Sequence, residues 1–291
     1  MREEVFVFLG IIVFILILYA VLFMEKSSYM RVPKKIWTYC SSVDKLTKVE
    51  KLCIESWKRL QPDYEIVILI PENIHGYVII PNYIVSHPIF RESSKRFSDL
   101  IRLFVLVEHG GIWMDLRCII NQPLEKWLFP KYADYSGFFM QRMTTQKEFP
   151  HVVESFMACN KGCEFIKKWR DEFVSILEYP NIAKYIESRI RMNIQLSEHY
   201  TDPISNAIQI AAQKVIQVDR YPLDSVLLKA VEDGPMKYLN DAKWNSEKAL
   251  QTLCSNTKNK YPIFILREED CNELNKRIDF DLSNEICKWI E

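Results

Sequence analysis

Residues 98–116 read Ser98-Asp99-Leu100-Ile101-Arg102-Leu103-Phe104-Val105-Leu106-Val107-Glu108-His109-Gly110-Gly111-Ile112-Trp113-Met114-Asp115-Leu116. Apolar residues recur at helical spacing as far as Val107 and cover nearly the whole circumference, which predicts a buried helix. Gly110-Gly111 supplies the positive-φ residue that ends a helix. Ile112-Trp113-Met114 is then a short buried strand, and Asp115 stands where that strand leaves the sheet. Ligands of open α/β folds bind at such carboxyl ends.

Two charges lie inside the predicted helix. Asp99 and Arg102 are three residues apart and therefore share one face. A buried charge is costly unless it is paired or binds something. Two interpretations stay open, an internal ion pair and a ligand-binding pair, and Asp115 after the Gly-Gly turn favours the second.

The remaining pattern alternates strands and helices. We expect a strand over 35–39, a helix over 45–60 and a strand over 64–70. This alternation predicts an α/β fold with a mostly parallel sheet flanked by helices. From Pro150 onward the chain is expected to be mainly helical, most clearly over 156–176. A last strand over 261–266 and an amphipathic helix over 283–290 complete the prediction.

The chain opens with an apolar segment. Val5–Phe23 carries no charge over nineteen residues, long enough to cross a bilayer core. A cleaved signal peptide is the alternative, but its apolar part is shorter, its start is basic and a cleavage site follows. We therefore expect a tail (1–4), a membrane anchor (5–24), a linker (25–31) and one domain (32–291).

Charge and cysteine content limit the possible binding partners and cellular compartment of the chain. The formal net charge is zero, so nothing points to nucleic acid. Lysine and arginine after the anchor favour a cytosolic domain, and the chain has no glycosylation sequon. The eight scattered cysteines have no zinc-type spacing, and we interpret them as buried reduced thiols.

The central motif resembles a known family. Ser98-Asp99-x-x-Arg102 followed by Gly110-Gly111-Ile112-Trp113-x-Asp115 is similar to the core of glycosyltransferase family 32, and closer still to the related capsular polysaccharide synthesis proteins. Residues 32–39 resemble that group's first strand, and residues 53–66 resemble its next helix and strand. The resemblance covers 32–125, with a weaker match over 155–169. It implies a single-domain nucleotide-sugar (GT-A, Rossmann-like) fold, with a nucleotide-sugar half (32–125) and a mainly helical acceptor half (126–291).

The resemblance also assigns roles to residues. It implies that Asp115 is catalytic, and that the donor is bound by a set of residues on the first strand, the central helix and the Gly-Gly strand: Trp37, Tyr39, Asp99, Arg102, Gly111 and Arg117. Core packing is the alternative for Trp37. A loose match over 198–203 places His199 and Asp202 on the acceptor side, although such a histidine is more often structural.

Metal binding stays open in the sequence. Related families place Asp-x-Asp at the strand end to hold Mn²⁺ or Mg²⁺, whereas this chain has Asp115-Leu116-Arg117. Asp115 alone could hold a hydrated ion with the diphosphate supplying other ligands. Alternatively, the Arg117 guanidinium contacts the diphosphate directly.

The predicted function is that of a membrane-anchored glycosyltransferase. It would move a hexose from a nucleotide diphosphate sugar to a hydroxyl of a glycan acceptor, and the resemblance implies retention of anomeric configuration. A non-catalytic sugar-binding homologue and a phosphotransferase acting on polysaccharide precursors are the alternatives. The charge bias favours the cytosolic side of the membrane, whereas fungal relatives imply the Golgi lumen.

Overall fold

The computed structural model describes residues 12–14, 18, 32–128, 133–200, 202–255 and 261–276, without the side chains of 252, 254 and 255. The chain divides into two compact units, Met1–Arg31 and Val32–Glu291, and the second is described below. Within the described residues, no helix has the length and apolar character needed to span a membrane. The predicted anchor, apart from 12–14 and 18, and the predicted helix over 283–290 lie outside the described residues.

A six-stranded sheet forms the centre of the second unit. Its strand order is β2-β1-β3-β6-β5-β7. The strands are β1 (Lys35–Tyr39), β2 (Glu65–Leu69), β3 (Gly111–Met114), β5 (Tyr135–Phe139), β6 (Val152–Cys159) and β7 (Val226–Ala230). β1 runs parallel to β2 and β3, and β5 runs parallel to β7, whereas β6 is antiparallel to both of its neighbours. The predicted mostly parallel sheet of an α/β fold is confirmed.

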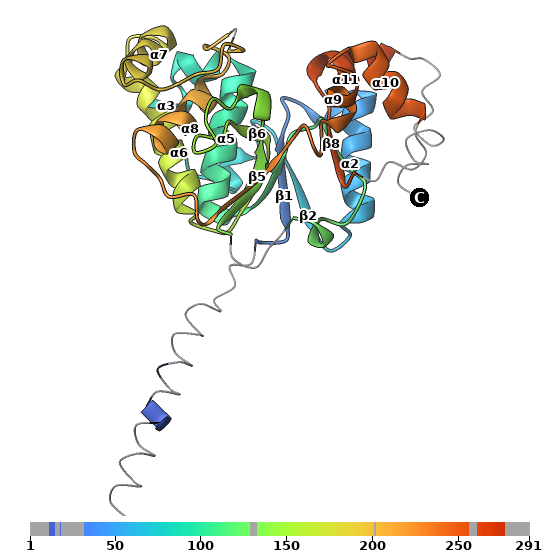
Figure 1. The fold of residues 1–291 in the computed structure, drawn as a ribbon, viewed down its shortest axis with the longest axis horizontal. Helices are drawn as coiled ribbons and strands as arrows, with labels where there is room; N and C mark the ends of the chain where they lie inside the picture. The colour runs from blue at the N-terminus through green and yellow to red at the C-terminus, as the bar shows by residue number, and fades with distance from the viewer. Residues whose placement is uncertain are drawn as a thin grey trace, which may run out of the picture. The chain divides into compact units, whose positions relative to one another are not determined.

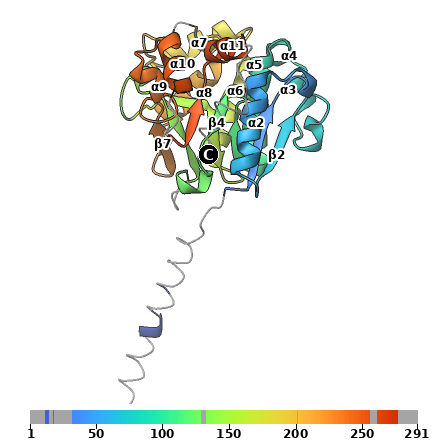
Figure 2. The same ribbon diagram turned by 90° about the vertical axis from the view of Figure 1, so that its right-hand side faces the viewer.

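Helices cover both faces of this sheet (Figure 1). One face carries α5 (Ser94–His109), α6 (Glu164–Val174) and α8 (Ala207–Gln217). The other carries α2 (Lys48–Leu60), α9 (Lys237–Asp241), α10 (Ser246–Ser255) and α11 (Glu268–Lys276), with a small antiparallel sheet of β4 (Cys118–Ile120) and β8 (Ile263–Ile265). Figure 2 shows α2 and α11 from that second side.

Shorter helices complete the unit. They are α3 (Asn82–Val85), α4 (Pro88–Arg91), α7 (Ile182–Arg191) and the 3-10 turns Val43–Lys45, Ile74–Gly76, Leu124–Lys126, Gln141–Met143 and Ser175–Glu178.

The sheet separates two apolar cores. Ile36 of β1 and Ile112 of β3 pack with α2 in what we call the α2-side core. Trp37 and Trp113, the next residue along each strand, pack with α5, α6 and α8 in the α5-side core. Side chains of a strand alternate between the two faces of the sheet, so two consecutive apolar residues on each strand contribute one side chain to each core.

α5 is the buried helix that its composition predicts. The Ser93 side chain accepts a hydrogen bond from the Arg96 backbone N–H, and the helix ends at Gly110 with φ of 64°. Its residues 99–106 are all buried. The apolar circumference is therefore matched by the sheet on one side and by α4 and α6 around it.

The predicted helix over 156–176 is wrong in its first part. Val152–Cys159 is strand β6, and the helix α6 begins only at Glu164. β6 lies between two helix layers, so side chains on both of its faces are apolar. A sequence that is apolar throughout lacks the alternation that would distinguish a strand from a helix. The expected mainly helical half therefore contributes β5, β6 and β7 to the central sheet.

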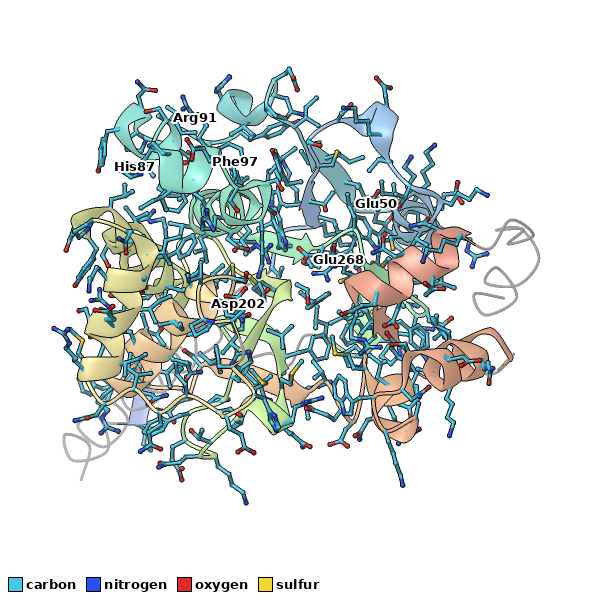
Figure 3. All side chains as sticks on the ribbon, turned by 90° about the horizontal axis from the view of Figure 1, so that it is seen from above. Glu50, His87, Arg91, Phe97, Asp202 and Glu268 are labelled. Atoms are coloured by element: carbon cyan, nitrogen blue, oxygen red, sulfur yellow. The ribbon has the colours of Figure 1, made fainter. Side chains whose placement is uncertain are left out.

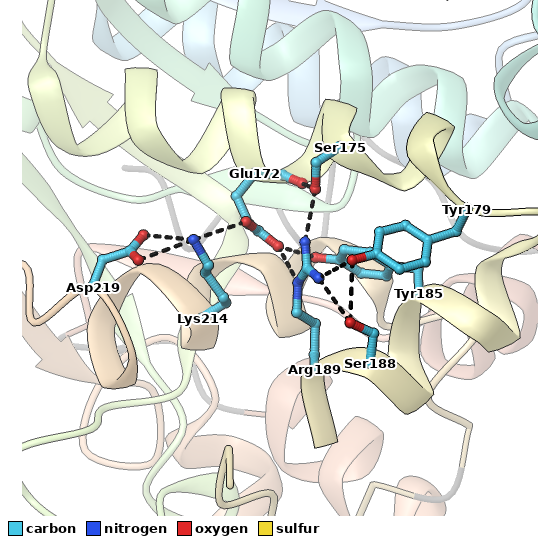
Figure 4. A network of polar contacts seen from close by, with 8 residues as sticks. All are labelled: Glu172, Ser175, Tyr179, Tyr185, Ser188, Arg189, Lys214 and Asp219. Carbon is cyan, nitrogen blue, oxygen red and sulfur yellow. Dashed lines mark hydrogen bonds and ion pairs between the residues drawn. The ribbon is translucent and has the colours of Figure 1, made fainter. Parts of the chain in front are cut away.

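A buried polar network joins α6, α7 and α8 (Figure 4). Arg189 Nε of α7 donates to Glu172 Oε1 of α6 over 2.6 Å, and Lys214 Nζ of α8 lies 3.2 Å from Glu172 Oε2. The Tyr185 hydroxyl donates to the same Glu172 carboxylate, and Asp219 pairs with Lys214. Because each buried charge has partners, the network fixes how the three helices pack.

Gly111→Ala is expected to destabilise the fold by about 3 kcal/mol or more. A Cβ there would meet Lys35 O at 2.7 Å and Trp37 Nε1 at 3.0 Å, and φ is +98°. Overpacking costs about 1–3 kcal/mol and positive φ about 1–2 kcal/mol. Gly162→Ala is the matched control, since its φ is +73° with nothing within 4 Å. Urea unfolding of both variants measures the difference, and equal losses would contradict the close approach of β1 to β3.

Candidate functional site

The carboxyl ends of β1 and β3 meet at one edge of the sheet. Trp37 pairs with Trp113, so the parallel register places Tyr39 level with Asp115. The Tyr39 ring packs on Phe97 of α5, with centroids 5.6 Å apart. Figure 3 views the molecule from this edge, with Phe97 and Asp202 on one side and residues of α2 and α11 on the other.

Four charged side chains come together here, and we call them the strand-end charge cluster: Asp99, Arg102, Asp115 and Arg117. Arg102 Nη2 lies 3.0 Å from Asp99 Oδ1 and 3.3 Å from Asp115 Oδ1. Arg117 Nη2 lies 3.2 Å from Asp115 Oδ2. The helix and the strand end thus supply one continuous array of alternating charge.

Neighbouring groups hold this array in place. Arg102 Nη1 donates to the backbone carbonyl of Glu154 over 2.7 Å, and its guanidinium stacks 5.0 Å from the centre of the Trp113 ring. Trp113 Nε1 donates to Asp115 Oδ1 over 2.8 Å. The side chains of Asp99 and Arg102 are 2% and 4% exposed, whereas that of Arg117 is 38% exposed. Arg117 is therefore the cation of the cluster that a ligand meets first.

The buried pair retains unused polar atoms. Arg102 Nη2 is within ion-pair distance of Asp99 Oδ1, but no N–H is aimed at that oxygen, and Arg102 Nε has no partner among the described residues. Burial raises the pKa of Asp99 to about 7, although Arg102 opposes the shift. The Asp99 carboxyl is thus only partly ionised near pH 7, and its Oδ1 accepts no hydrogen bond, so it is suited to bind a polar group of a ligand.

The two arginines stay charged. Burial disfavours the charge of Arg117, but Asp115 and Glu154 raise its pKa above the ordinary value. Burial also opposes the charge of Arg102, and Asp115 and Asp99 raise its pKa in the same way. Arg117 is the more exposed of these two permanent cations, and its guanidinium fork suits an anionic ligand such as phosphate.

Two of the predicted donor-binding residues pack in the protein instead. Trp37 has no exposed surface, and its Nε1 donates to the Gly110 carbonyl over 2.9 Å. Gly111 begins β3 against the β1 backbone, whereas Asp115 follows the other end of that strand. The structure thus shows the core packing that was the alternative for Trp37, whose ring lies in the α5-side core, and a close approach of Gly111 to β1.

The predicted acceptor residues lie outside the charge cluster. His199 and Asp202 are both exposed. The Asp202 carboxylate accepts from the Ile204 and Ser205 backbone N–H groups, so it closes a turn. Lys95 at the start of α5 donates to the Ser205 carbonyl and ties that turn to the helix.

Three residues of this edge were missed from the sequence: His151, Glu154 and Tyr200. The Tyr200 hydroxyl is 2.6 Å from His151 Nδ1, and burial lowers the pKa of His151 to about 4, so the imidazole is neutral at pH 7. Glu154 precedes Ser155, whose carbonyl accepts from the Asp115 backbone N–H over 2.9 Å. Recognising 152–159 as a strand antiparallel to β3 would have located both β6-side residues.

The residues at this edge do not fit a divalent cation held by protein ligands alone. Within the described ranges, no group of three or more His, Cys, Asp or Glu side chains is placed to hold a metal ion. Both oxygens of Asp115 already face N–H donors of Arg102, Trp113 and Arg117. A cation at Asp115 would have to displace a guanidinium.

A cavity of about 660 Å³ lies apart from this cluster, beside β5 and β7. Its lining includes Phe139, Gln141, Lys147 and Leu228, and none of the four cluster residues. It carries no ionisable pair comparable with that of the strand-end charge cluster.

Comparison with known proteins gives one family match. The model of a family described as "Capsular polysaccharide synthesis protein" matches residues 20–263. The chain is 24% identical over 106 residues to "Inositol phosphoceramide mannosyltransferase 3" of Schizosaccharomyces pombe, a match that covers 36% of this chain and 28% of that protein.

Solved structures with distant likeness were also found. A galactosyltransferase, LgtC, in complex with donor and acceptor sugar analogs, matches with a TM-score of 0.43 and 12% identity over 83% of this chain and 95% of its own. A glycosyltransferase involved in glycosylation of the major capsid of PBCV-1 matches with a TM-score of 0.42 and 9% identity over 83% of this chain and 98% of its own.

The difference in stability between Asp99→Asn and the wild type is expected to shift in favour of the variant as pH rises from about 4 to about 7, whatever the loss of the Arg102 partner costs at every pH. The ordinary pKa of Asp99 is 3.8 and that in the folded protein is about 7, so the folded state binds more protons in this window. Wild-type stability then falls as pH rises, by at most about 1.4 kcal/mol per pH unit, and Asn removes that loss. Urea unfolding at pH 4, 5.5 and 7.5 tests this. A stability difference that does not change with pH would show that folding leaves the pKa of Asp99 at its ordinary value.

Proposed function

Because the chain belongs to the family of capsular polysaccharide synthesis proteins, we propose that it is a glycosyltransferase acting on a nucleotide diphosphate sugar. In this proposal a hexose passes to a hydroxyl of a glycan acceptor within a single GT-A-like domain. The observation that carries the proposal is the pairing of Asp115 with two arginines at the carboxyl end of β3. Glycosyltransferase names among the similar proteins agree with it.

The charge cluster suits the chemistry of the leaving group. Negative charge develops on the nucleotide diphosphate as its bond to the sugar breaks, and fixed cations stabilise that charge. Arg117 is exposed enough to contact the diphosphate oxygens, and Asp115 holds its guanidinium in place. Asp99, with an unsatisfied oxygen, is suited to a sugar or ribose hydroxyl. Retention of anomeric configuration remains part of the proposal because family 32 resemblance implies it.

We extend the proposal to a membrane anchor over Val5–Phe23. Its support is the sequence, nineteen residues without a charge. The lipid bilayer is thus a proposed partner of the chain. Deleting residues 5–23 should release the protein from a membrane pellet into the supernatant, and continued sedimentation with membranes would contradict the anchor.

Asp115→Asn is expected to lower turnover by about a hundredfold, the scale of losing an electrostatic stabiliser. Asn keeps an oxygen that accepts from Trp113 Nε1 but loses the charge that aligns the two arginines. Nucleotide-sugar hydrolysis by the full chain, with UDP-glucose, UDP-galactose and GDP-mannose as donors, measures the effect. The exposed Asp63→Asn is the matched control. Near-normal turnover by Asp115→Asn would remove this carboxylate from the mechanism.

Arg117 is expected to replace part of the charge that a metal ion supplies in Asp-x-Asp relatives. Activity should then survive chelation in part, and Arg117→Ala should weaken UDP or GDP binding by about 1.5–3 kcal/mol, the range for a hydrogen bond to a charged group. Calorimetry and an assay with EDTA test both points. Complete loss of activity in EDTA, restored by Mn²⁺, would end this role for Arg117.

A further inference from the structure

The pairing between β5 and β6 is interrupted beside the charge cluster. Gly137 pairs with Met157, but the next residue, Phe138, pairs with Val153. An advance of one residue along β5 thus corresponds to four residues along β6. Residues 154–156 have no partner on β5 and form a bulge. On the other side of β6, the Asp115 backbone N–H donates to the carbonyl within this bulge. Bulges next to active sites re-aim side chains.

This bulge changes the face on which the β6 side chains lie. Side chains of a regular strand alternate, so residues 152, 154 and 156 would share one face. Phe156 packs in the α2-side core, whereas Val152 packs in the α5-side core and Val153 in the α2-side core. The alternation therefore shifts between Val153 and Phe156. Glu154 lies at the start of this irregular stretch, where its backbone carbonyl accepts from Arg102 and its charge acts on Asp99, Arg102 and Arg117 of the strand-end charge cluster.

The Glu154 carboxylate is half-buried and unpaired. Among the described residues it makes no hydrogen bond and no ion pair, although its backbone carbonyl accepts from Arg102. Burial is the main cause that raises the pKa of Tyr200 and of Asp99, and the charge of Glu154 raises both further. For Asp99, Arg102 acts in the opposite direction. A partly desolvated carboxylate without a partner is costly, and such groups are kept where they meet a ligand.

A negative group at this place would stabilise the transition state of glycosyl transfer. The sugar ring becomes oxocarbenium-like as its bond to the leaving group breaks. Adjacent strands lie about 4.8 Å apart, so a carboxylate on β6 is within reach of a sugar whose diphosphate sits at the end of β3. Asp99 and Asp115 of the cluster both pair with Arg102, whereas the neighbouring Glu154 carboxylate makes no ion pair among the described residues.

We propose that Glu154 is a further catalytic residue, whose carboxylate contacts the donor sugar and stabilises the positive charge that develops at its anomeric centre. This inference rests on the proposed function. In the step, the bond between the anomeric carbon and the diphosphate oxygen breaks, and the electron pair stays on that oxygen. The hydroxyl oxygen of the acceptor, or of water in hydrolysis, forms the new bond to the anomeric carbon, and the proton of that hydroxyl passes to the released diphosphate. Glu154 gives and takes no proton, and it acts through its charge alone.

Glu154→Gln in the full chain tests the proposal, since Gln keeps the size and removes the charge. Donor hydrolysis without acceptor is measured with UDP-glucose, UDP-galactose and GDP-mannose. We expect kcat to fall by about a hundredfold. The KM for the donor and the Kd for UDP or GDP should stay within about threefold, because the lost interaction is made only in the transition state. Glu164→Gln, an exposed carboxylate at the start of α6, should match the wild type.

The outcomes distinguish a failure of the role of Glu154 from a failure of the proposed transferase function. Full activity of Glu154→Gln overturns the role of Glu154 and leaves the transferase function standing. A parallel loss of UDP binding and kcat overturns it as well, because Glu154 would then only support Arg102. A loss in transfer to acceptor without a loss in hydrolysis would assign Glu154 to the acceptor instead. A wild-type chain that cleaves none of the three donors overturns the transferase function and this inference together.

Discussion

The buried guanidinium of Arg102 is the interaction on which the site depends. It reaches Asp99 on its own helix, Asp115 beyond the end of β3 and the backbone carbonyl of Glu154 on β6. A charge that is about 4% exposed is tolerated only with several partners, and removing one partner of such a set costs about 3–5 kcal/mol. One side chain thereby fixes the relative positions of α5, β3 and β6, and with them every charged group at this edge.

The direction of β6 gives the site its second half. In a purely parallel sheet, the carboxyl ends of the strands would supply all of the residues at this edge. β6 runs against β3, so it is its amino-terminal end that reaches the charge cluster. The Ser155 carbonyl, next to Glu154, therefore accepts from the Asp115 backbone N–H. His151, just before β6, packs against the ring of Tyr200. A single reversed strand combines residues from both halves of the chain.

Asp115 acts as a link between cations. Its two oxygens face different arginines, one buried and one 38% exposed. With a second aspartate in place of Arg117, the same strand end would present two carboxylates to a metal ion, as in Asp-x-Asp proteins. With arginine, the same geometry presents a guanidinium fork, whose shape matches phosphate oxygens. The proposed chemistry is unchanged, but the positive charge comes from the chain.

The sequence by itself determined α5, the Gly-Gly turn, β3 and the grouping of Asp99, Arg102 and Asp115, because these features depend on spacing within nineteen residues. It also indicated the family, through the same motif. Only the tertiary structure decided that Trp37 belongs to the core, that Val152–Cys159 is a strand and that Glu154 lies beside the cluster. An apolar run buried on both faces has no informative period. The neighbours of Glu154 come from α5 and β3, which lie far from it in the sequence and meet it only in the folded chain.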